Sequence, residues 1–127
     1  MKTNSLSEAR YLLLRAMRTR GFNPELVGDR SLNVVTPDYN FSLSFMPGNR
    51  RVLISHKVFI HPASRNRGLG KKLLAMREEL AREAGINLLL ATVKNDNEVE
   101  IHLLKKAKWE RMVNRLGTKT SLWGKKL

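Results

Sequence analysis

The sequence predicts a mixed α/β fold, in which helices pack on a sheet that contains both parallel and antiparallel strands. Its clearest support is the stretch 51–93, where a strand pattern, a glycine-rich turn, a helix pattern and an apolar strand follow one another. Strand-like segments with turn residues between them precede this stretch, and a pair divided by a glycine follows it. No internal repeat, low-complexity tract or linker interrupts the 127 residues, so we expect one domain over residues 1–127.

The first element expected is a helix over residues 6–20. Apolar side chains recur there at spacings of three and four, as on the buried face of an amphipathic helix. Ser5 or Ser7 can cap its start, and Gly21 can end it. This helix precedes all of the expected strands.

Three strands separated by two tight turns are expected next. They span residues 32–36, 41–46 and 51–60. Polar and apolar residues alternate in the second of them, which is the pattern of a strand with one buried face. The turn sequences are Pro37-Asp38-Tyr39-Asn40 and Pro47-Gly48-Asn49, in which proline and glycine favour the backbone angles of a turn.

A helix over residues 68–84 and an apolar strand over 87–93 complete the strand–helix–strand unit. The helix has one apolar stripe, and its charged residues, Arg77 and Glu78 among them, are assigned to the other, mixed-charge face. The strand is apolar almost throughout, which is typical of a strand inside a parallel sheet. We therefore expect it to run parallel to the strand at 51–60.

A second helix and a closing hairpin are expected at the end of the chain. The helix spans residues 97–106. Two strands, at 109–113 and 118–123, form the hairpin around Leu116-Gly117. Together with the preceding elements, they complete the mixed sheet.

The chain is strongly basic and contains no cysteine. Lysine and arginine number 24 against 11 acidic residues, which gives a net charge of +13. Such a charge attracts polyanions, among them nucleic acid, acidic proteins and polyphosphate cofactors. The lack of cysteine excludes disulfides, thiolate metal sites and a cysteine nucleophile, and we expect no metal. Because no secretory signal or membrane-spanning run is recognisable, we expect a cytoplasmic location and no membrane partner.

The turn that opens the helix at 68–84 has the composition of an anion site. Gly68 and Gly70 let a diphosphate approach the backbone, where the first helical amides have no partners and the helix dipole is positive. The cations around the turn are Arg65, Arg67, Lys71 and Lys72. The P-loop and dinucleotide-binding patterns do not match, because each lacks a required glycine. A cofactor diphosphate, another anion, and a turn that binds nothing remain the alternatives.

Two segments resemble the sequence motifs of a known enzyme family. In residues 58–74 an apolar strand end, His61-Pro62, the pattern Arg-x-x-Gly-x-Gly and an amphipathic helix follow in order. This arrangement resembles the cofactor-binding motif of the GNAT family of N-acetyltransferases. Residues 97–109 are similar to that family's next block, Asn-x-x-Ala-x-x-Leu-Tyr-x-x-x-Gly-Phe, and the resemblance covers about residues 51–113.

The resemblance implies a compact GNAT member with a GNAT-like acyl-CoA N-acyltransferase fold whose N-terminal part is shortened. It implies an N-acetyltransferase that moves an acetyl group from acetyl-CoA, its co-substrate, directly to an amine. Family members hold this cofactor in a wedge between two parallel strands, which here are 51–60 and 87–93. The positions that match the family's cofactor-binding residues are Val58, Phe59, Ile60, Arg65, Asn66, Arg67, Gly68, Leu69, Gly70, Lys71 and Asn97.

His56 is the candidate catalytic residue, as a general base for the acceptor amine. Some family members place such a group on this strand; a half-buried histidine satisfied by its neighbours is the alternative. The family's second block supplies a tyrosine that protonates the departing thiolate, and Leu104 stands at that position. Glu100 replaces the alanine of the same block, and Lys108 replaces its glycine.

The acceptor implied by the resemblance is an amine, and the charge of the chain favours a macromolecule or an acidic partner. A protein lysine, a protein N-terminus and an aminoacyl-tRNA are the candidates. The alternative is a catalytically weak or inactive module of the same fold that binds nucleic acid or an acidic protein, with an affinity that falls steeply with salt. Its basic residues would be Lys105, Lys106, Lys108, Arg111, Arg115, Lys125 and Lys126.

Overall fold

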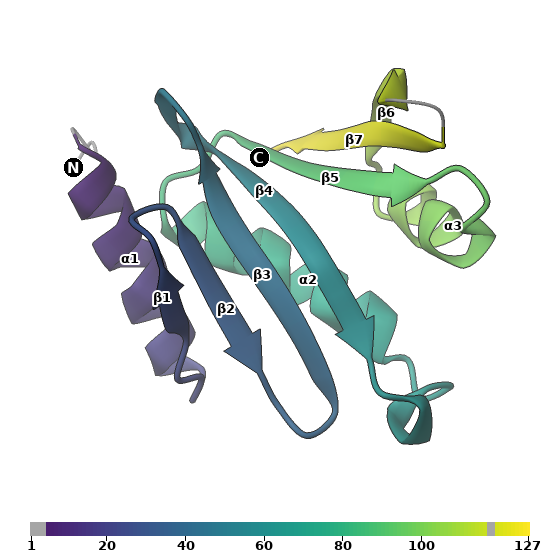
Figure 1. Cartoon of the computed structure of the whole chain (residues 1–127), viewed down its shortest axis with the longest axis horizontal. Coiled ribbons are helices and arrows are strands. Elements are labelled where there is room, and N and C mark those ends of the chain that lie inside the picture. The colour runs from purple at the N-terminus through teal and green to yellow at the C-terminus, as the bar shows by residue number, and fades with distance from the viewer. Residues whose placement is uncertain (1–4, 117–118) are drawn as a thin grey trace.

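The computed structural model describes residues 5–116 and 119–127, and at residues 57 and 113–116 it describes the backbone alone. Seven strands of this part form one sheet in the order β1-β2-β3-β4-β5-β7-β6 (Figure 1). The strands are β1 (Glu25–Val27), β2 (Ser31–Val35), β3 (Tyr39–Met46), β4 (Asn49–Ile60), β5 (Leu88–Lys94), β6 (Glu110–Leu116) and β7 (Thr120–Lys126). The helices are α1 (Leu6–Thr19), α2 (Leu69–Glu83), α3 (Glu98–Lys106) and the short 3-10 turn η1 (Pro62–Ser64). β4 and β5 are parallel and the other neighbouring strands are antiparallel, so the predicted mixed α/β fold is confirmed.

The turn between β2 and β3 is shorter than the sequence suggested. Tyr39 and Asn40 were expected in this turn, but both belong to β3. The backbone N–H of Thr36 donates to the carbonyl oxygen of Tyr39 at 2.9 Å. The turn therefore has only Pro37 and Asp38 as its central residues. β3 can pair with β4 directly after them.

The two ends of the sheet also differ from the expectation. β1 was not predicted, because its three exposed residues are too few to form a recognisable pattern; it pairs antiparallel with β2. β7 continues past the expected end at 123 to Lys126, where it still pairs with β5. Gly117, expected in the closing turn, lies outside the described residues.

α1 and α2 pack together, and the main core lies between them and one face of the sheet (Figure 1). Alternate residues of β3, namely Phe41, Leu43 and Phe45, are buried there with Leu13 of α1 and Leu80 of α2. Fully burying one such side chain stabilises the fold by about 1.5–3 kcal/mol. Among the described residues, no helix combines the length and the apolar character that crossing a bilayer requires.

Two charged residues of α2 are buried, which corrects their assignment to an exposed mixed-charge face. Arg77 is 2% exposed and Glu78 is 6% exposed. The carboxylate of Glu78 accepts hydrogen bonds from Lys125 Nζ at 2.5 Å and from Trp109 Nε1 at 3.2 Å. These contacts tie α2 to β7 and satisfy the buried charge. Arg77 has a different environment, described below.

β4 and β5 separate along their length, as expected for a cofactor wedge. Their parallel pairing ends at Ser55 and Ala91, although β4 runs on to Ile60 and β5 to Lys94. Beyond that point β4 stays paired with β3, and β5 stays paired with β7. A register shift in the β3–β4 pairing lies at the same level, and such bulges bend a strand. The sheet is therefore open between its two central strands.

Candidate functional site

A groove of about 900 Å³ opens where β4 and β5 part. Its walls come from the end of β4, the loop at 65–70, one side of α2, the end of β5 and the start of α3. All of the predicted site residues except Arg67 line it. The groove joins two chemically different ends: the glycine loop, and the point where the two strands separate.

At the first end, the backbone donors at the start of α2 have no hydrogen-bond partner among the residues that the structure describes. Gly68 precedes the helix with a left-handed backbone (φ 72°), and no side chain caps the helix there. The first bond of the helix runs from the N–H of Lys72 to the carbonyl oxygen of Gly68 at 3.2 Å. The amides of residues 69–71 precede that bond, as the first amides of any helix do. A Cβ at Gly68 would meet nothing within 4 Å, and residues 68–71 all line the groove.

Gly70 is needed for a different reason, namely close packing. A Cβ built there would lie 3.2 Å from Leu103 Cδ1 of α3 and 3.8 Å from Ile60 Cδ1 of β4. Glycine thus lets three elements meet at the bottom of the groove. The two glycines of the motif have separate roles: Gly68 supplies the backbone angle, and Gly70 supplies the space.

Arg65 and Arg67 of this loop are held differently. Arg65 Nε donates to the carbonyl oxygen of Ile60 at 2.9 Å, and its guanidinium carbon lies 5.5 Å from the ring centroid of Phe59. Both Arg65 and Phe59 are exposed and line the groove. Arg65 is therefore placed to meet an anion in front of α2.

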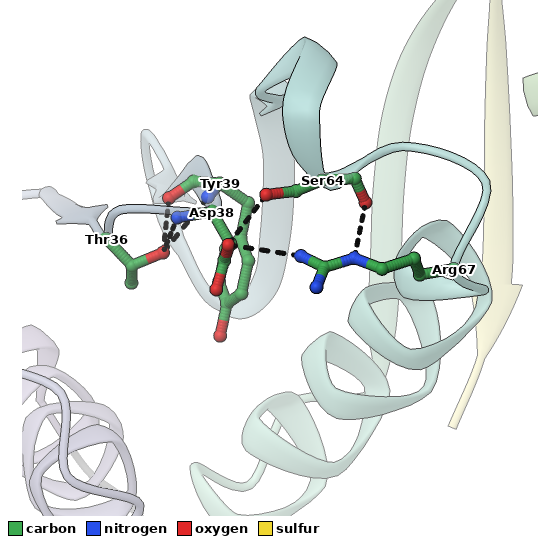
Figure 2. Close-up of polar contacts among 5 residues, drawn as sticks. All are labelled: Thr36, Asp38, Tyr39, Ser64 and Arg67. Carbon is green, nitrogen blue, oxygen red and sulfur yellow. Dashed lines mark hydrogen bonds and ion pairs between the residues drawn. The ribbon is translucent and has the colours of Figure 1, made fainter.

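Arg67 instead points to the turn between β2 and β3 (Figure 2). Its Nη2 lies 3.2 Å from the carboxylate of Asp38, which also accepts a 2.6 Å hydrogen bond from Ser64 Oγ. The hydrogen bond from Ser64 and the positive charge of Arg67 lower the pKa of Asp38. Thr36 Oγ1 accepts from the N–H groups of Asp38 and Tyr39 and so fixes that turn. The network ties the glycine loop to the β2–β3 turn.

The remaining predicted cofactor residues lie along the groove between its two ends. Val58, Phe59 and Ile60 form the part of β4 that is not paired with β5. An open strand edge of this kind can accept an extended ligand as an added strand. Asn97 lines the opposite wall, and its Oδ1 caps α3 by accepting from the N–H of Glu100 at 3.2 Å.

His56 also lines the groove and is half-buried. Its Nε2 lies 2.7 Å from Ser44 Oγ, which lies 2.7 Å from Ser31 Oγ. The three side chains connect β4, β3 and β2 across one face of the sheet. A general base needs a fixed tautomer and a path for its proton, and this row of hydroxyls could supply both. The same hydroxyls would also provide the hydrogen bonds of a histidine that has only a structural role.

The fold and the groove match those of one family. The sequence model of the "Acetyltransferase (GNAT) family" matches residues 13–109 of this chain. The chain belongs to the GNAT family of acetyltransferases. Its expected compact α/β fold is the GNAT fold, which several solved structures share.

Two curated relatives are longer than this chain. Over 108 residues the chain is 29% identical to the L-amino acid N-acyltransferase MnaT of Escherichia coli, covering 84% of this chain and 62% of MnaT. Over 53 residues it is 36% identical to the L-methionine sulfoximine/L-methionine sulfone acetyltransferase of Salmonella typhimurium, covering 42% of this chain and 31% of that enzyme. The chain thus spans less than two thirds of either relative.

Solved GNAT structures share the fold at low sequence identity. The GNAT acetyltransferase of Streptococcus pneumoniae superimposes with a TM-score of 0.63 at 16% identity, over 99% of this chain and 98% of that one. The structure of YncA from Salmonella typhimurium with its cofactor acetyl-CoA gives a TM-score of 0.61 at 19% identity, over 94% of this chain and 73% of YncA.

This GNAT chain departs from the family pattern at two positions, one in α3 and one just after it. Lys108 stands where the family has glycine, and its backbone is left-handed (φ 68°). The turn after α3 therefore keeps the glycine-like conformation, at some cost in strain. Leu104 stands where the family has tyrosine, and it is fully buried in the core. An acid is therefore missing at that position.

Sequence reasoning missed the residues at the second end of the groove. Ser55, Arg77 and Glu100 all line it, and they come from β4, α2 and α3. Arg77 Nε donates to the carbonyl oxygen of Leu73 at 3.1 Å, and its Nη1 donates to Ser55 Oγ. One signal could have found Arg77: it lies four residues after Leu73, on the stripe that the helix buries. Charge alone had assigned it to the surface.

Proposed function

We propose that this chain is an N-acetyltransferase that moves an acetyl group from acetyl-CoA directly to an amine. The observation that carries the proposal is the continuous groove between the unused amides at the start of α2 and the open edge of β4. A diphosphate fits the first feature and an extended, amide-containing arm fits the second, and coenzyme A contains both.

The residues of the groove fit this cofactor. The amides of residues 69–71 would bind the pyrophosphate together with Arg65 and Lys71, while the open space at Gly68 admits the phosphate oxygens. The arm would lie along Val58–Ile60, opposite Asn97. Arg67 would act through its ion pair with Asp38, by holding the loop in place rather than by touching the phosphates.

Direct transfer agrees with the composition of the chain. No cysteine is present, so a cysteinyl intermediate is excluded. A backbone N–H on the open edge of β4 would polarise the thioester carbonyl. A lysine-like acceptor, with a pKa of about 10.4, must first lose a proton, which at pH 7 costs about 4–5 kcal/mol. His56 is our proposed base for this step, with the hydroxyl of Ser44 next to it.

The acceptor we propose is an amine on an acidic partner or a macromolecule, such as a protein lysine, a protein N-terminus or an aminoacyl-tRNA. The net charge of +13 supports this class, because such a charge concentrates polyanions near the protein. The name of MnaT, an L-amino acid N-acyltransferase, supports a second candidate, the α-amino group of a free amino acid.

The test is acetyl transfer from labelled acetyl-CoA to cell lysate, to aminoacyl-tRNA and to free amino acids, read by mass spectrometry. Gly68→Asp should abolish transfer, because it places a carboxylate where the diphosphate binds. Gly48→Asp is the matched control: Gly48 also has a left-handed backbone (φ 78°) and open space around it, but it lies in the turn between β3 and β4. Equal transfer by wild type and Gly68→Asp would refute the proposed site. A salt-sensitive affinity for nucleic acid with no transfer at all would favour the non-catalytic module.

A further inference from the structure

The end of the groove opposite the glycine loop contains a buried cation to which the proposed function assigns no role. Arg77 is 2% exposed, yet it lines the groove where β4 and β5 part. Its Nε and Nη1 donate to Leu73 and Ser55. For Nη2, the described residues offer no hydrogen-bond partner. Nη2 is not one of the buried, unsatisfied side-chain atoms of the described residues, so it reaches the open groove, where a bound molecule can accept a hydrogen bond from it.

The guanidinium keeps its positive charge in this position. Burial lowers the pKa of Arg77, while the charges of Glu100 and Glu78 act in the opposite direction. Arginine is protonated throughout the range in which proteins work. The carboxylate of Glu78 is already occupied by Lys125 and Trp109, so the charge of Arg77 is balanced at this end of the groove mainly by Glu100.

The position of Arg77 along the groove corresponds to the reactive end of the cofactor. This step rests on the proposed function. Ile60 lies five residue steps along β4 from Ser55, a length of about 17 Å. A cofactor that binds its diphosphate at the start of α2 and extends along β4 toward Ser55 brings its sulfur end to the point where the strands part. Arg77 and Glu100 lie there.

We propose that Arg77 is a catalytic residue that stabilises the departing thiolate of coenzyme A. The amine nitrogen forms a bond to the thioester carbonyl carbon, the C–S bond breaks, and its electron pair stays on sulfur. The proton lost by the amine goes to the base, and the thiolate takes a proton from water after it leaves. Arg77 supplies positive charge at the moment when sulfur becomes negative. This replaces the proton donor that is missing at Leu104.

Other charged groups lining the groove also influence the sulfur, and their expected effects differ. Lys71 of α2 and Lys94 of β5 are exposed, so water screens their charges. His56 of β4 is half-buried and bonded to Ser44. Glu100 of α3 is partly buried and negative, so it opposes Arg77. Arg77 is thus the buried cation at this position. Removing the negative charge of Glu100 should change the thiol pKa in the direction opposite to removing the charge of Arg77.

The experiment is an ultraviolet titration of the thiol of bound coenzyme A, with desulfo-coenzyme A as the blank. Because the chain contains no cysteine, coenzyme A supplies the one thiol in the sample. A free thiol has a pKa of about 8.5. We expect bound coenzyme A to titrate about one unit lower in the wild type. Arg77→Met should raise that pKa by about one unit or more, Arg77→Lys should keep it close to the wild type, and Glu100→Gln should lower it further.

Each outcome decides between distinct conclusions. A wild type that does not bind coenzyme A contradicts the proposed function, and the role of Arg77 fails with it. If coenzyme A binds but its thiol titrates equally in wild type, Arg77→Met and Glu100→Gln, the role of Arg77 is refuted while the cofactor site stands. If Arg77→Met does not fold, the comparison of wild type with Glu100→Gln decides, since the partly exposed Glu100 tolerates this isosteric change. An unchanged thiol pKa in Glu100→Gln then overturns the inference.

Discussion

The two ends of the groove are built in different ways. The anion end consists of backbone amides and two glycines within one stretch of seven residues, 65–71. The reacting end consists of the side chains of Ser55, Arg77 and Glu100, which three separate elements bring together. The first end depends on local backbone conformation, and the second depends on how the whole fold packs. The two ends should therefore fail in different ways: variants of the first should weaken cofactor binding, and variants of the second should slow the reaction.

Among the variants that leave the diphosphate site itself unfilled, the largest effect is expected at Gly70. In Gly70→Val the new side chain would push against Leu103 and Ile60. We expect the KM for acetyl-CoA to rise by roughly 100-fold, and the free energy of unfolding to fall by about 1–3 kcal/mol from overpacking. Steady-state kinetics and thermal unfolding measure both. Ala75→Val, on the exposed side of the same helix, is the control; equal effects of the two variants would mean that helix propensity, not packing, is responsible.

His56→Gln tests the proposed base near the reacting end. Loss of a general base should lower kcat by roughly 100-fold, with little change in the KM for acetyl-CoA. The limb of the pH–rate profile that depends on the deprotonated base should disappear. If the profile keeps its shape, the hydrogen bond to Ser44 makes His56 a structural residue, and the assignment as base is wrong.

Arg77→Met should lower kcat by roughly 10- to 30-fold, less than the roughly 100-fold or more of a lost oxyanion donor, because a thiolate with a free pKa of about 8.5 already leaves easily. The KM for acetyl-CoA should stay within about threefold of the wild type, because the diphosphate is bound at the other end. Arg82→Met, a half-exposed arginine of the same helix that pairs with Glu78 at 3.6 Å, controls for lost charge. A change in KM alone would place Arg77 in binding instead of in the reaction.

The smallest effect is expected at Asp38, which holds Arg67 and Ser64 but touches no cofactor in our proposal. Asp38→Asn should raise the KM for acetyl-CoA by about two- to fivefold, the modest scale of exposed ion pairs, and leave kcat unchanged. The pKa of Asp38 is lowered from its ordinary 3.8. Its charge therefore contributes fully above pH 3.8 and is lost only as the pH falls through the lower folded value. From pH 5 to 8 the difference in KM between wild type and variant should be constant; a difference that varies with pH in this window would point to another group.

The contrast between the two ends also explains what the sequence could predict. The loop at 65–70 was recognised because its function depends on residue types that are adjacent in the chain. β3, β4 and the helices followed from their periodicity, whereas β1 was too short to be recognised. Arg77 was not assigned to the groove, because a charged residue on a helix is usually exposed. Its contact with Leu73 lies within the helix, whereas its contact with Ser55 of β4 is one that only the fold creates.

The proposed activity depends most on the binding of a diphosphate at the start of α2. Titration calorimetry with acetyl-CoA and with acetyl-pantetheine, which lacks the diphosphate, tests this directly. We predict that wild-type protein binds acetyl-CoA at least about 100-fold more tightly than acetyl-pantetheine, and that Gly68→Asp removes this difference. Equal affinity of the wild type for the two compounds would contradict the account.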